Sequence, residues 1–310
     1  MTTSARQRVA ASDTLATARR VERLRQYMSA QVLGSSGECV CRKLGSCRRS
    51  VLFDGRGAPR PEVSFAAGQL SHVGRHYDLT LGGVPCRILV VAMDTVRPRE
   101  HVTLEQRHAE VMESAELPFN RRNPHMKGTA SALRLAVGRE PGSDRGGEQL
   151  YLSGVRQPVH LFDAYAMANL RLCSATADGQ RSLSNATMSR NCLPHLAATI
   201  QILEPTLCIV QGVQVGKVLT ELMSRRRNLA PRLERVRIAG VDTLVAAFTN
   251  PSARGSYRWG GLNGVPYLYE TVAPALRVAH QLVVGASAPA GNATVHPQRR
   301  PATPDRQPPR

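Results

Sequence analysis

Three polar residues stand where apolar runs of strand length end. Asp94 follows the run RILVVAM, Asn169 closes the run VHLFDAYAMAN, and Asn250 follows TLVAAFT. A carboxylate in such a position can orient a water molecule or stabilise a cation, and an asparagine amide can donate and accept hydrogen bonds. These residue types indicate a polar site for a base edge or a water. For Asp94 a second interpretation stays open, because aspartate often caps the following turn or helix.

The loop that contains Asn250 is rich in arginine. Residues 250–252 read Asn-Pro-Ser, and Arg254, Arg258 and the chain's only tryptophan, Trp259, follow soon after. Proline stiffens the loop, and arginine pairs with phosphate through a planar fork of donors. We therefore expect this loop to bind nucleic acid, with Trp259 either stacking on a base or serving as a core or lid residue.

The whole chain is strongly basic. Its 310 residues include 41 Lys and Arg against 23 Asp and Glu, a formal net charge of +18, and its only lysines are Lys43, Lys127 and Lys217. Such an excess favours a polyanionic partner, because binding releases counterions. The alternative is that arginine-rich coding and basic tails inflate the sum. No apolar run approaches the roughly 18 residues of a membrane-spanning helix, so we expect no membrane partner.

Five of the seven cysteines fall in two short segments. Cys39, Cys41 and Cys47 lie near the N-terminus, and Cys173 and Cys192 lie in the middle of the chain. The first twenty residues lack the apolar stretch of a signal peptide, so we expect a reducing cytoplasm, where cysteines are metal ligands or buried residues rather than disulfides. Four thiolates would suit an iron–sulfur cluster or a structural zinc ion. The other two cysteines are predicted to be core residues.

A further segment, LPFNRRNPHMKGT at 117–129, places an aromatic side chain beside two arginines. Phe119 could therefore stack on a base while the arginines contact phosphates. Alternatively the segment only begins a helix at Gly128-Thr129, with His125 on the surface.

The elements that must position these residues alternate between strand and helix. Apolar runs predict strands at 87–93, 159–170, 206–212 and 243–249. Helical spacing predicts helices at 13–33, 101–115, 129–137, 188–203, 213–225 and 264–283. This alternation predicts an α/β fold with three α/β/α layers around a central, mostly parallel four-stranded sheet. In such sheets functional residues gather at the carboxyl ends of the strands.

The flanks differ in composition from this central part. Residues 1–35 form a basic N-terminal arm or helix, with Asp13 as a candidate N-cap, and residues 284–310 form a Pro/Arg-rich tail that we expect to be disordered. The remaining residues, 36–283, make up one predicted domain.

One run of residues resembles the uracil-DNA glycosylase superfamily, and its iron–sulfur family 4 most closely. Asn169 is followed by Cys173, a second cysteine at 192 precedes a helix, and Ile-Leu-Glu-Pro at 202–205 leads into a strand that ends at Gly212. The resemblance covers roughly residues 39–280, so the domain at 36–283 is predicted to be a uracil-DNA glycosylase-like domain.

The resemblance implies a 4Fe–4S cluster with a structural role, zinc being the alternative. Cys173 and Cys192 would supply two ligands, and Cys47 with either Cys41 or Cys39 would supply the others. The N-terminal cysteines depart from the C-x2-C pair of the family.

The resemblance also implies roles at the substrate. Asn169 matches the asparagine that reads the flipped base, Phe119 resembles the aromatic residue that stacks on uracil, and Asp94 falls in the motif that activates water. Asn250, Pro251 and Ser252 take the place of a histidine-proline-serine loop, with Arg254 beside it as a phosphate ligand. The family's Gly-Glu-x-Pro-Gly motif is replaced here by AMDTV, and the loop histidine is replaced by asparagine.

The expected function is therefore base excision. The chain would be a monofunctional DNA glycosylase, because no lysine lies in these motifs to form a Schiff base. It would act as a monomer on DNA that contains uracil or a mismatched base, in the cytoplasm at the nucleoid. Two alternatives stay open: a nucleic-acid-binding protein of the same fold that has lost most activity, and an unrelated α/β enzyme whose cysteines bind zinc.

Overall fold

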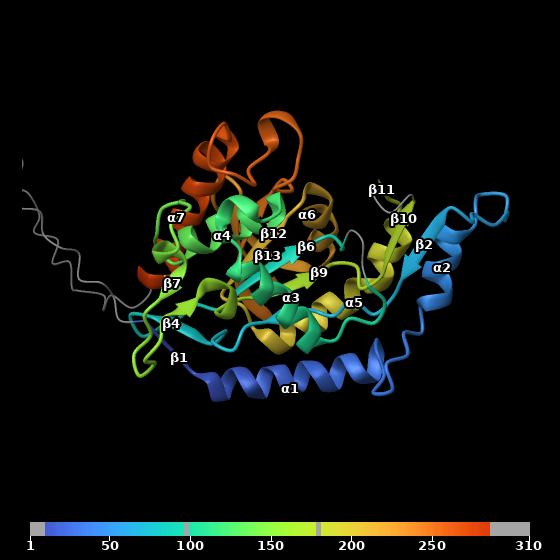
Figure 1. Cartoon of the computed structure of the whole chain (residues 1–310), viewed down its shortest axis with the longest axis horizontal. Coiled ribbons are helices and arrows are strands. Elements are labelled where there is room, and N and C mark those ends of the chain that lie inside the picture. The colour runs from blue at the N-terminus through green and yellow to red at the C-terminus, as the bar shows by residue number, and fades with distance from the viewer. Residues whose placement is uncertain (1–9, 96–98, 178–180, 286–310) are drawn as a thin grey trace, which may run out of the picture.

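The computed structural model of the chain describes residues 10–95, 99–177 and 181–285, with the side chain of Arg181 left aside (Figure 1). Nearly all of the tail predicted at 284–310, and the first nine residues of the predicted arm, lie outside these ranges. The described part is a mixed α/β structure with seven α-helices and a seven-stranded sheet of mixed direction. The predicted α/β class is confirmed. None of the helices in these ranges is long and apolar enough to cross a bilayer.

Seven strands make up the large sheet. Their order is β13 (Met223–Ala230), β14 (Leu233–Ile238), β15 (Val241–Phe248), β12 (Leu207–Gln211), β6 (Ile88–Ala92), β9 (Ala166–Asn169) and β3 (His72–Val73). The four strands from β15 to β9 pair in parallel, and the outer strands pair antiparallel. The strands predicted at 87–93, 206–212 and 243–249 are confirmed. Of the run at 159–170, only the last residues form β9, since the earlier ones form β8 (Val159–His160) and a 3-10 turn (Leu161–Asp163).

Apolar residues on both faces explain why the central strands read as continuous runs. Every residue of β6 and β12 is buried. In β6, Ile88 and Val90 face one core, and Leu89 and Val91 face another. The first core contains residues of α4 (Pro124–Ala136) and α7 (Ala273–Gly285). The second core contains residues of three helices, α1 (Thr14–Gln31), α5 (Ala186–Leu203) and α6 (Val213–Leu219).

Side-chain caps set the beginnings of most helices. Asp13 accepts a hydrogen bond from the Ala16 amide at 2.8 Å, which confirms it as the N-cap of α1. A capping box at Thr103 begins α3 (Leu104–Glu116). Asn123 caps α4 and places a proline at its first position, so α4 begins five residues before the predicted start. Asn185 caps α5, which is helical on both sides of its internal proline.

Two helices differ from prediction at one end. The helix predicted at 213–225 ends at Leu219, and after a 3-10 turn (Thr220–Leu222) the chain enters strand β13. The helix predicted at 264–283 begins with a π-helical turn (Leu268–Val272) and continues as α7 to Gly285. The last three residues of the first predicted helix therefore belong to β13, an arginine-rich strand at the edge of the sheet.

Helix α1 is docked on the domain, not a solvated arm. Its residues Leu24 and Met28 are fully buried in the core beside α5. On its polar side, Arg20 donates to Asp78, to Glu204 and to the carbonyl oxygen of Ile202. These last two partners lie at the C-terminal end of α5, where an arginine stabilises unpaired carbonyl groups.

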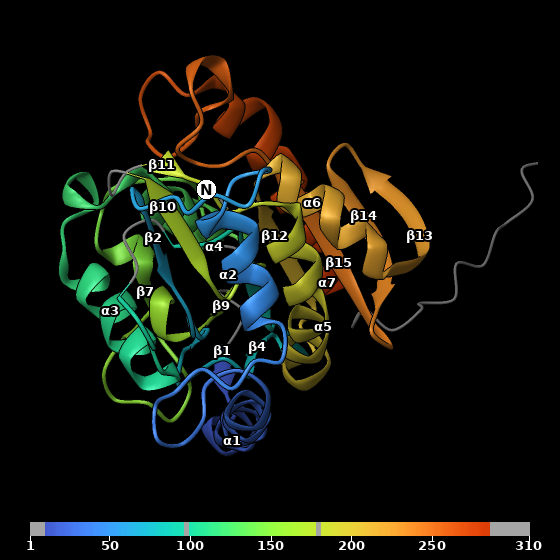
Figure 2. The ribbon, with the colours of Figure 1, turned by 90° about the vertical axis from the view of Figure 1, so that its right-hand side faces the viewer.

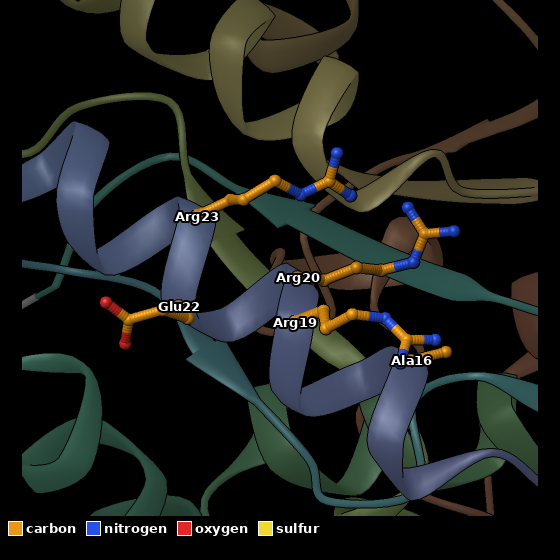
Figure 3. A pocket seen from close by; sticks show the side chains of 5 residues that line it. All are labelled: Ala16, Arg19, Arg20, Glu22 and Arg23. Atoms are coloured by element: carbon orange, nitrogen blue, oxygen red, sulfur yellow. The ribbon is translucent and has the colours of Figure 1, made fainter.

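Three of the four arginines of α1 lie along one side of the helix, whereas Arg25 pairs with Glu22 and Glu105. Figure 3 shows Arg19, Arg20 and Arg23 pointing the same way, while Glu22 points away from them. Together with Ala16, these four residues line a cavity of about 510 Å³. Because Arg20 is held in ion pairs, part of the chain's positive charge has a structural role and is not available to a polyanion.

A buried histidine makes the stability of this fold sensitive to acid. His72 on β3 is completely buried, its Nε2 lies 2.8 Å from the Phe162 carbonyl oxygen, and its ring stacks on His108. Burial, with the neighbouring His108 as a second cause, lowers the pKa of His72 to about 3. The neutral form is favoured in the folded state, so this contribution to stability is complete above the unfolded pKa of about 6.5 and is lost as the pH falls towards 3.

We therefore expect the melting temperature to fall between pH 6.5 and pH 4, and to fall less in His72→Gln. The glutamine cannot take up a proton, and each pKa unit of difference corresponds to about 1.4 kcal/mol. Thermal unfolding followed by circular dichroism at several pH values measures the difference between the two proteins. Parallel pH profiles would contradict a neutral, buried His72.

Candidate functional site at the carboxyl edge of the sheet

Two of the predicted site residues meet where β6 and β9 end. Asn169 is the register partner of Ala92 in the parallel pair. The pairing continues beyond both strands, because the amide of Leu170 donates to Ala92 and that of Arg171 donates to Met93. This places the segment from Asp94 next to the segment from Asn169.

An ion pair holds the carboxylate of Asp94. Arg171 Nη1 lies 3.2 Å from Asp94 Oδ2, and Ser182 Oγ lies 3.4 Å from the same oxygen. Arg171 is oriented in turn by Ser189, which accepts from its Nε at 2.8 Å. The Asp94 side chain is 7% exposed. The carboxylate is therefore fixed in one orientation beside a permanent positive charge.

The amide of Asn169 is also fixed. Its Nδ2 donates to Thr95 Oγ1 at 3.1 Å, and the residue is buried. Since Thr95 follows Asp94 directly, the two predicted site residues lie in one continuous group of polar side chains.

Asn250 lies on the same edge but not in the same group. It follows β15, which is separated from β6 by β12, so two strand spacings of about 4.8 Å lie between the strand ends. Asn250 is exposed, and its Oδ1 accepts a hydrogen bond from the Ser252 amide at 2.8 Å. Ser252 and Arg254 are exposed as well. The edge thus combines a buried carboxylate and amide with an exposed amide and cation.

Trp259 is a core residue, which confirms one of its two interpretations and excludes the other, stacking on a base. The side chain is completely buried, its Nε1 donates to the Thr249 carbonyl at 2.8 Å, and its ring packs on Phe248. The indole thereby fastens the loop to the strand that it leaves. The exposed side chains of the loop include Arg254, Tyr257 and Arg258, which can contact phosphate and a base face.

The loop packs directly against the first turns of α4. A Cβ at Gly260 would lie 2.1 Å from the Pro124 carbonyl oxygen, and a Cβ at Gly128 would lie 2.6 Å from Pro251. The backbone of the loop thus lies directly on the first turns of α4.

Gln211 is a polar residue at this edge that was not predicted, and His125 is one that was expected on the surface. Gln211 ends β12, is completely buried, and donates through Nε2 to Thr129 Oγ1 of α4 at 3.1 Å. The signal that could have identified Gln211 is its position as a polar residue at the end of an apolar strand, which is also the position of Asn169. His125 lies in the first turn of α4, and burial lowers its pKa to about 4. Its imidazole is therefore neutral at pH 7, and it is partly buried where the surface was expected.

Phe119 lies beside a different set of polar groups. It is buried in a 3-10 turn (Phe119–Arg121) after α3 and lines a cavity of about 360 Å³. The same cavity is lined by Arg122 and Glu148, which form a buried ion pair at 2.7 Å. The structure does not bring Phe119 to the polar group at Asp94, and its role in stacking stays a prediction.

Two of the predicted cysteine ligands lie in a separate small core, and Cys192 lies in the large core that contains α5. A three-stranded antiparallel sheet supports the small core, formed by β2 (Val63–Ala66), β10 (Ser174–Ala177) and β11 (Arg181–Ser182). Helix α2 (Leu44–Leu52) packs on this sheet. Cys47 and Cys173 are buried in this core. None of these elements was predicted, because each is too short to show a period.

Thiols of the two cysteine segments lie close enough to raise each other's pKa. Burial raises the pKa of the Cys173 thiol, and the nearby thiols of Cys192, Cys39 and Cys47 raise it further. Burial also raises the pKa of Cys192 to about 12, and Cys47 and Cys41 add to this. A negative charge on any of these thiols is therefore unfavourable unless a cation lies among them.

His195 is an unpredicted neighbour of this cysteine group. Its Nε2 lies 3.7 Å from Cys41 Sγ, and its Nδ1 lies 3.0 Å from the Tyr27 hydroxyl. Within the described residues, no three histidine, cysteine or acidic side chains are arranged as they stand to hold a metal ion. Cys86 and Cys208 are buried in the two large cores, which confirms their interpretation as core residues.

The sequence matches no protein-family model and no curated protein.

The contact between the loop and α4 can be tested with neighbouring glycines. Gly260→Ala places a methyl group against the Pro124 backbone, whereas the same change at Gly261 meets only ordinary contacts at 3.8 Å. We expect Gly260→Ala to lower the free energy of unfolding by about 1–3 kcal/mol. Gly261→Ala should change it by less than about 0.5 kcal/mol. Urea unfolding measures both, and equal effects would show that the loop is free to move away from α4.

Proposed function

We propose that the chain is a DNA glycosylase that removes uracil or a related deaminated or mispaired base. The observation that carries the proposal is the pairing of Asn169 with Ala92, which aligns a fixed amide and the Asp94 carboxylate at the edge where parallel strands end. The proposal extends to the architecture, a three-layer α/β/α domain organised around the four parallel strands.

The substrate must first leave the duplex. A base within the helix is out of reach of buried side chains, so its nucleotide is extruded at a cost of a few kcal/mol. The exposed Arg254 and Arg258, with Tyr257 between them, offer phosphate contacts and an aromatic face that offset this cost. The amide of Asn169 then distinguishes the polar edge of the extruded base by donating and accepting hydrogen bonds.

Cleavage of the glycosidic bond separates charge. The sugar becomes positive and the departing base becomes negative. Asp94 stabilises the sugar and orients the attacking water, and Arg171 keeps the carboxylate aimed. Asn250 can offer hydrogen bonds to the base but no positive charge, so stabilisation of the leaving group is weaker than a histidine would provide.

The ion pair also favours a second candidate, a DNA-binding protein with little activity. Arg171 neutralises Asp94 at 3.2 Å, which reduces the ability of the carboxylate to stabilise a cation. In this alternative, the arginine-rich loop would still hold DNA.

We further propose a structural 4Fe–4S cluster, with zinc as the alternative. Cys47, Cys173 and Cys192, together with Cys41 or Cys39, would be its ligands, because Cys47 and Cys173 share the small core and Cys192 accepts a hydrogen bond from the Leu172 amide next to Cys173. When bound, the group would supply the positive charge that these thiolates lack. It would join the N-terminal segment to α5 and would take no part in base removal.

The release of free base tests the function directly. Oligonucleotides carrying uracil, hypoxanthine, or G·T and G·U mispairs serve as substrates, in single-stranded and double-stranded form. We expect release from at least one of them, and a loss of about 10²–10⁴-fold in Asp94→Asn. Ser182→Ala, which also removes a contact to Asp94 Oδ2, should retain most of the rate.

Two outcomes would overturn or redirect the proposal. Unchanged release in Asp94→Asn would mean that the carboxylate only neutralises Arg171. Absence of release from every substrate, with DNA binding intact, would favour the DNA-binding candidate. Because Asp94→Asn leaves Arg171 unpaired, thermal unfolding of the variant must accompany the assay. Asn250→His should raise the rate by restoring a group able to carry positive charge.

The proposed cluster is tested by metal content. Protein purified without oxygen should contain iron and absorb near 400 nm, and both should be lost in Cys173→Ser and Cys192→Ser. Cys86→Ser is the matched control, because Cys86 is equally buried but lies in a different core. Zinc in equal molar amount in a colourless protein would replace the iron–sulfur assignment. Protein without either metal would refute it.

A further inference from the structure

The antiparallel hairpin of β13 and β14 extends the large sheet away from its parallel centre. β13 is the edge strand, and Figure 2 shows it at the margin of the molecule, beyond β14 and β15. Five successive residues of β13, from Ser224 to Asn228, are exposed. Its pairing with β14 is irregular between Ser224 and Arg227, and Arg225 has a positive φ of 50°. The hairpin therefore presents a long, exposed and uneven edge.

This edge is strongly basic. Between Met223 and Asp242 the chain contains only two acidic residues, Glu234 and Asp242. The six arginines of the same segment are Arg225, Arg226, Arg227, Arg232, Arg235 and Arg237. Positive charge thus exceeds negative charge threefold.

Only two of these arginines hold a carboxylate. Arg226 makes two hydrogen bonds to Glu234, at 2.8 and 2.9 Å, and Arg237 pairs with Asp242. Arg237 is the main cause of the lowered pKa of Asp242. The positive charges of Arg225 and Arg235 lower this pKa further, by smaller amounts. Within the described residues, four of the six arginines make no ion pair within hydrogen-bond distance.

Two unpaired arginines face each other across the hairpin. Arg227 is the register partner of Arg235. Like charges directly opposite each other on antiparallel strands are destabilising. By contrast, Arg20 of α1 forms ion pairs with Asp78 and Glu204. The hairpin therefore carries an unbalanced charge that an external anion would relieve.

A basic cavity connects the hairpin with the carboxyl edge of the sheet. It has a volume of about 370 Å³ and lies between α6 and the hairpin. Lys217, Arg226 and Arg232 line it against one carboxylate, Glu234, so its lining carries a net positive charge. Gly212 and Phe248, at the ends of β12 and β15, line it too. Phe248 lies two residues before Asn250, so this cavity reaches the strand end from which the Asn250 loop begins.

We propose that the β13–β14 hairpin is a second phosphate-binding surface that holds the backbone of duplex DNA beside the extruded nucleotide. The choice of DNA as the polyanion rests on the proposed function. Charge on an edge strand also prevents pairing with other chains. That role does not require arginines to face each other or to line a cavity. A phosphate backbone supplies regularly spaced negative charges along such an edge, without reading sequence.

The double variant Arg225→Gln/Arg227→Gln tests this surface. Binding of an undamaged duplex is measured by fluorescence anisotropy at several salt concentrations. Each lost phosphate contact lowers the slope of log K against log salt by about 0.9, so we expect the slope to fall by nearly 2. Near 100 mM salt the affinity should fall roughly tenfold or more. The control Arg19→Gln/Arg156→Gln removes the same charge from exposed positions on α1 and in the turn before β8, and it should leave the slope nearly unchanged.

The outcomes separate this inference from the proposed function. Equal effects of both double variants would overturn it, because only net charge would then matter. So would binding to vesicles of anionic lipid that depends on Arg225 and Arg227 while duplex binding does not. A reduced slope without any base release would support the hairpin surface and refute the glycosylase. Base release with an unchanged slope would support the glycosylase and refute the hairpin surface. Neither double variant should unfold at a lower temperature than the unmodified chain.

Discussion

The register between β6 and β9 is the constraint on which the candidate site depends. In this pair Ala92 is opposite Asn169, and the backbone bonds continue to Met93 and Arg171. A shift of one residue would turn every side chain to the other face of the sheet. Asn169 would then leave the polar edge and Ala168 would enter it. The buried apolar faces on both sides of β6 keep the register fixed, so packing energy in the two large cores maintains the alignment of the polar groups.

Arginine has three distinct roles in this chain. Arg20 joins α1 to the end of α5, and Arg122 forms a buried pair with Glu148. Arg171 orients a carboxylate at the candidate site. A net charge of +18 does not distinguish these satisfied cations from the unpaired ones of the hairpin. The structure makes the distinction, because hydrogen-bond partners depend on contacts between residues far apart in the sequence.

The sequence was informative where burial is continuous and uninformative where contacts are distant. The apolar runs at β6, β12 and β15 predicted three parallel strands, and at β6 and β15 also the polar residues Asp94 and Asn250 that follow them. The helix predicted across 213–225 was wrong beyond Leu219, because the apolar spacing of that segment fits helix and edge strand equally well. The sequence left the role of Trp259 open between core and stacking, since its burial depends on the return of its loop to Phe248 and on the small residues of α4.

Helix α5 links the polar group at Asp94 to the cysteine core through hydrogen bonds to Arg171 and Leu172. Its Ser189 accepts a hydrogen bond from Arg171, which holds Asp94, and one turn later Cys192 accepts from the Leu172 amide beside the cysteine core. Residues 171 and 172 are thus tied to the same helical turn from both sides. A displacement of α5 by damage to the cysteine core would tilt the guanidinium and rotate the carboxylate with it. The orientation of the Asp94 carboxylate therefore depends on the packing of the cysteine core.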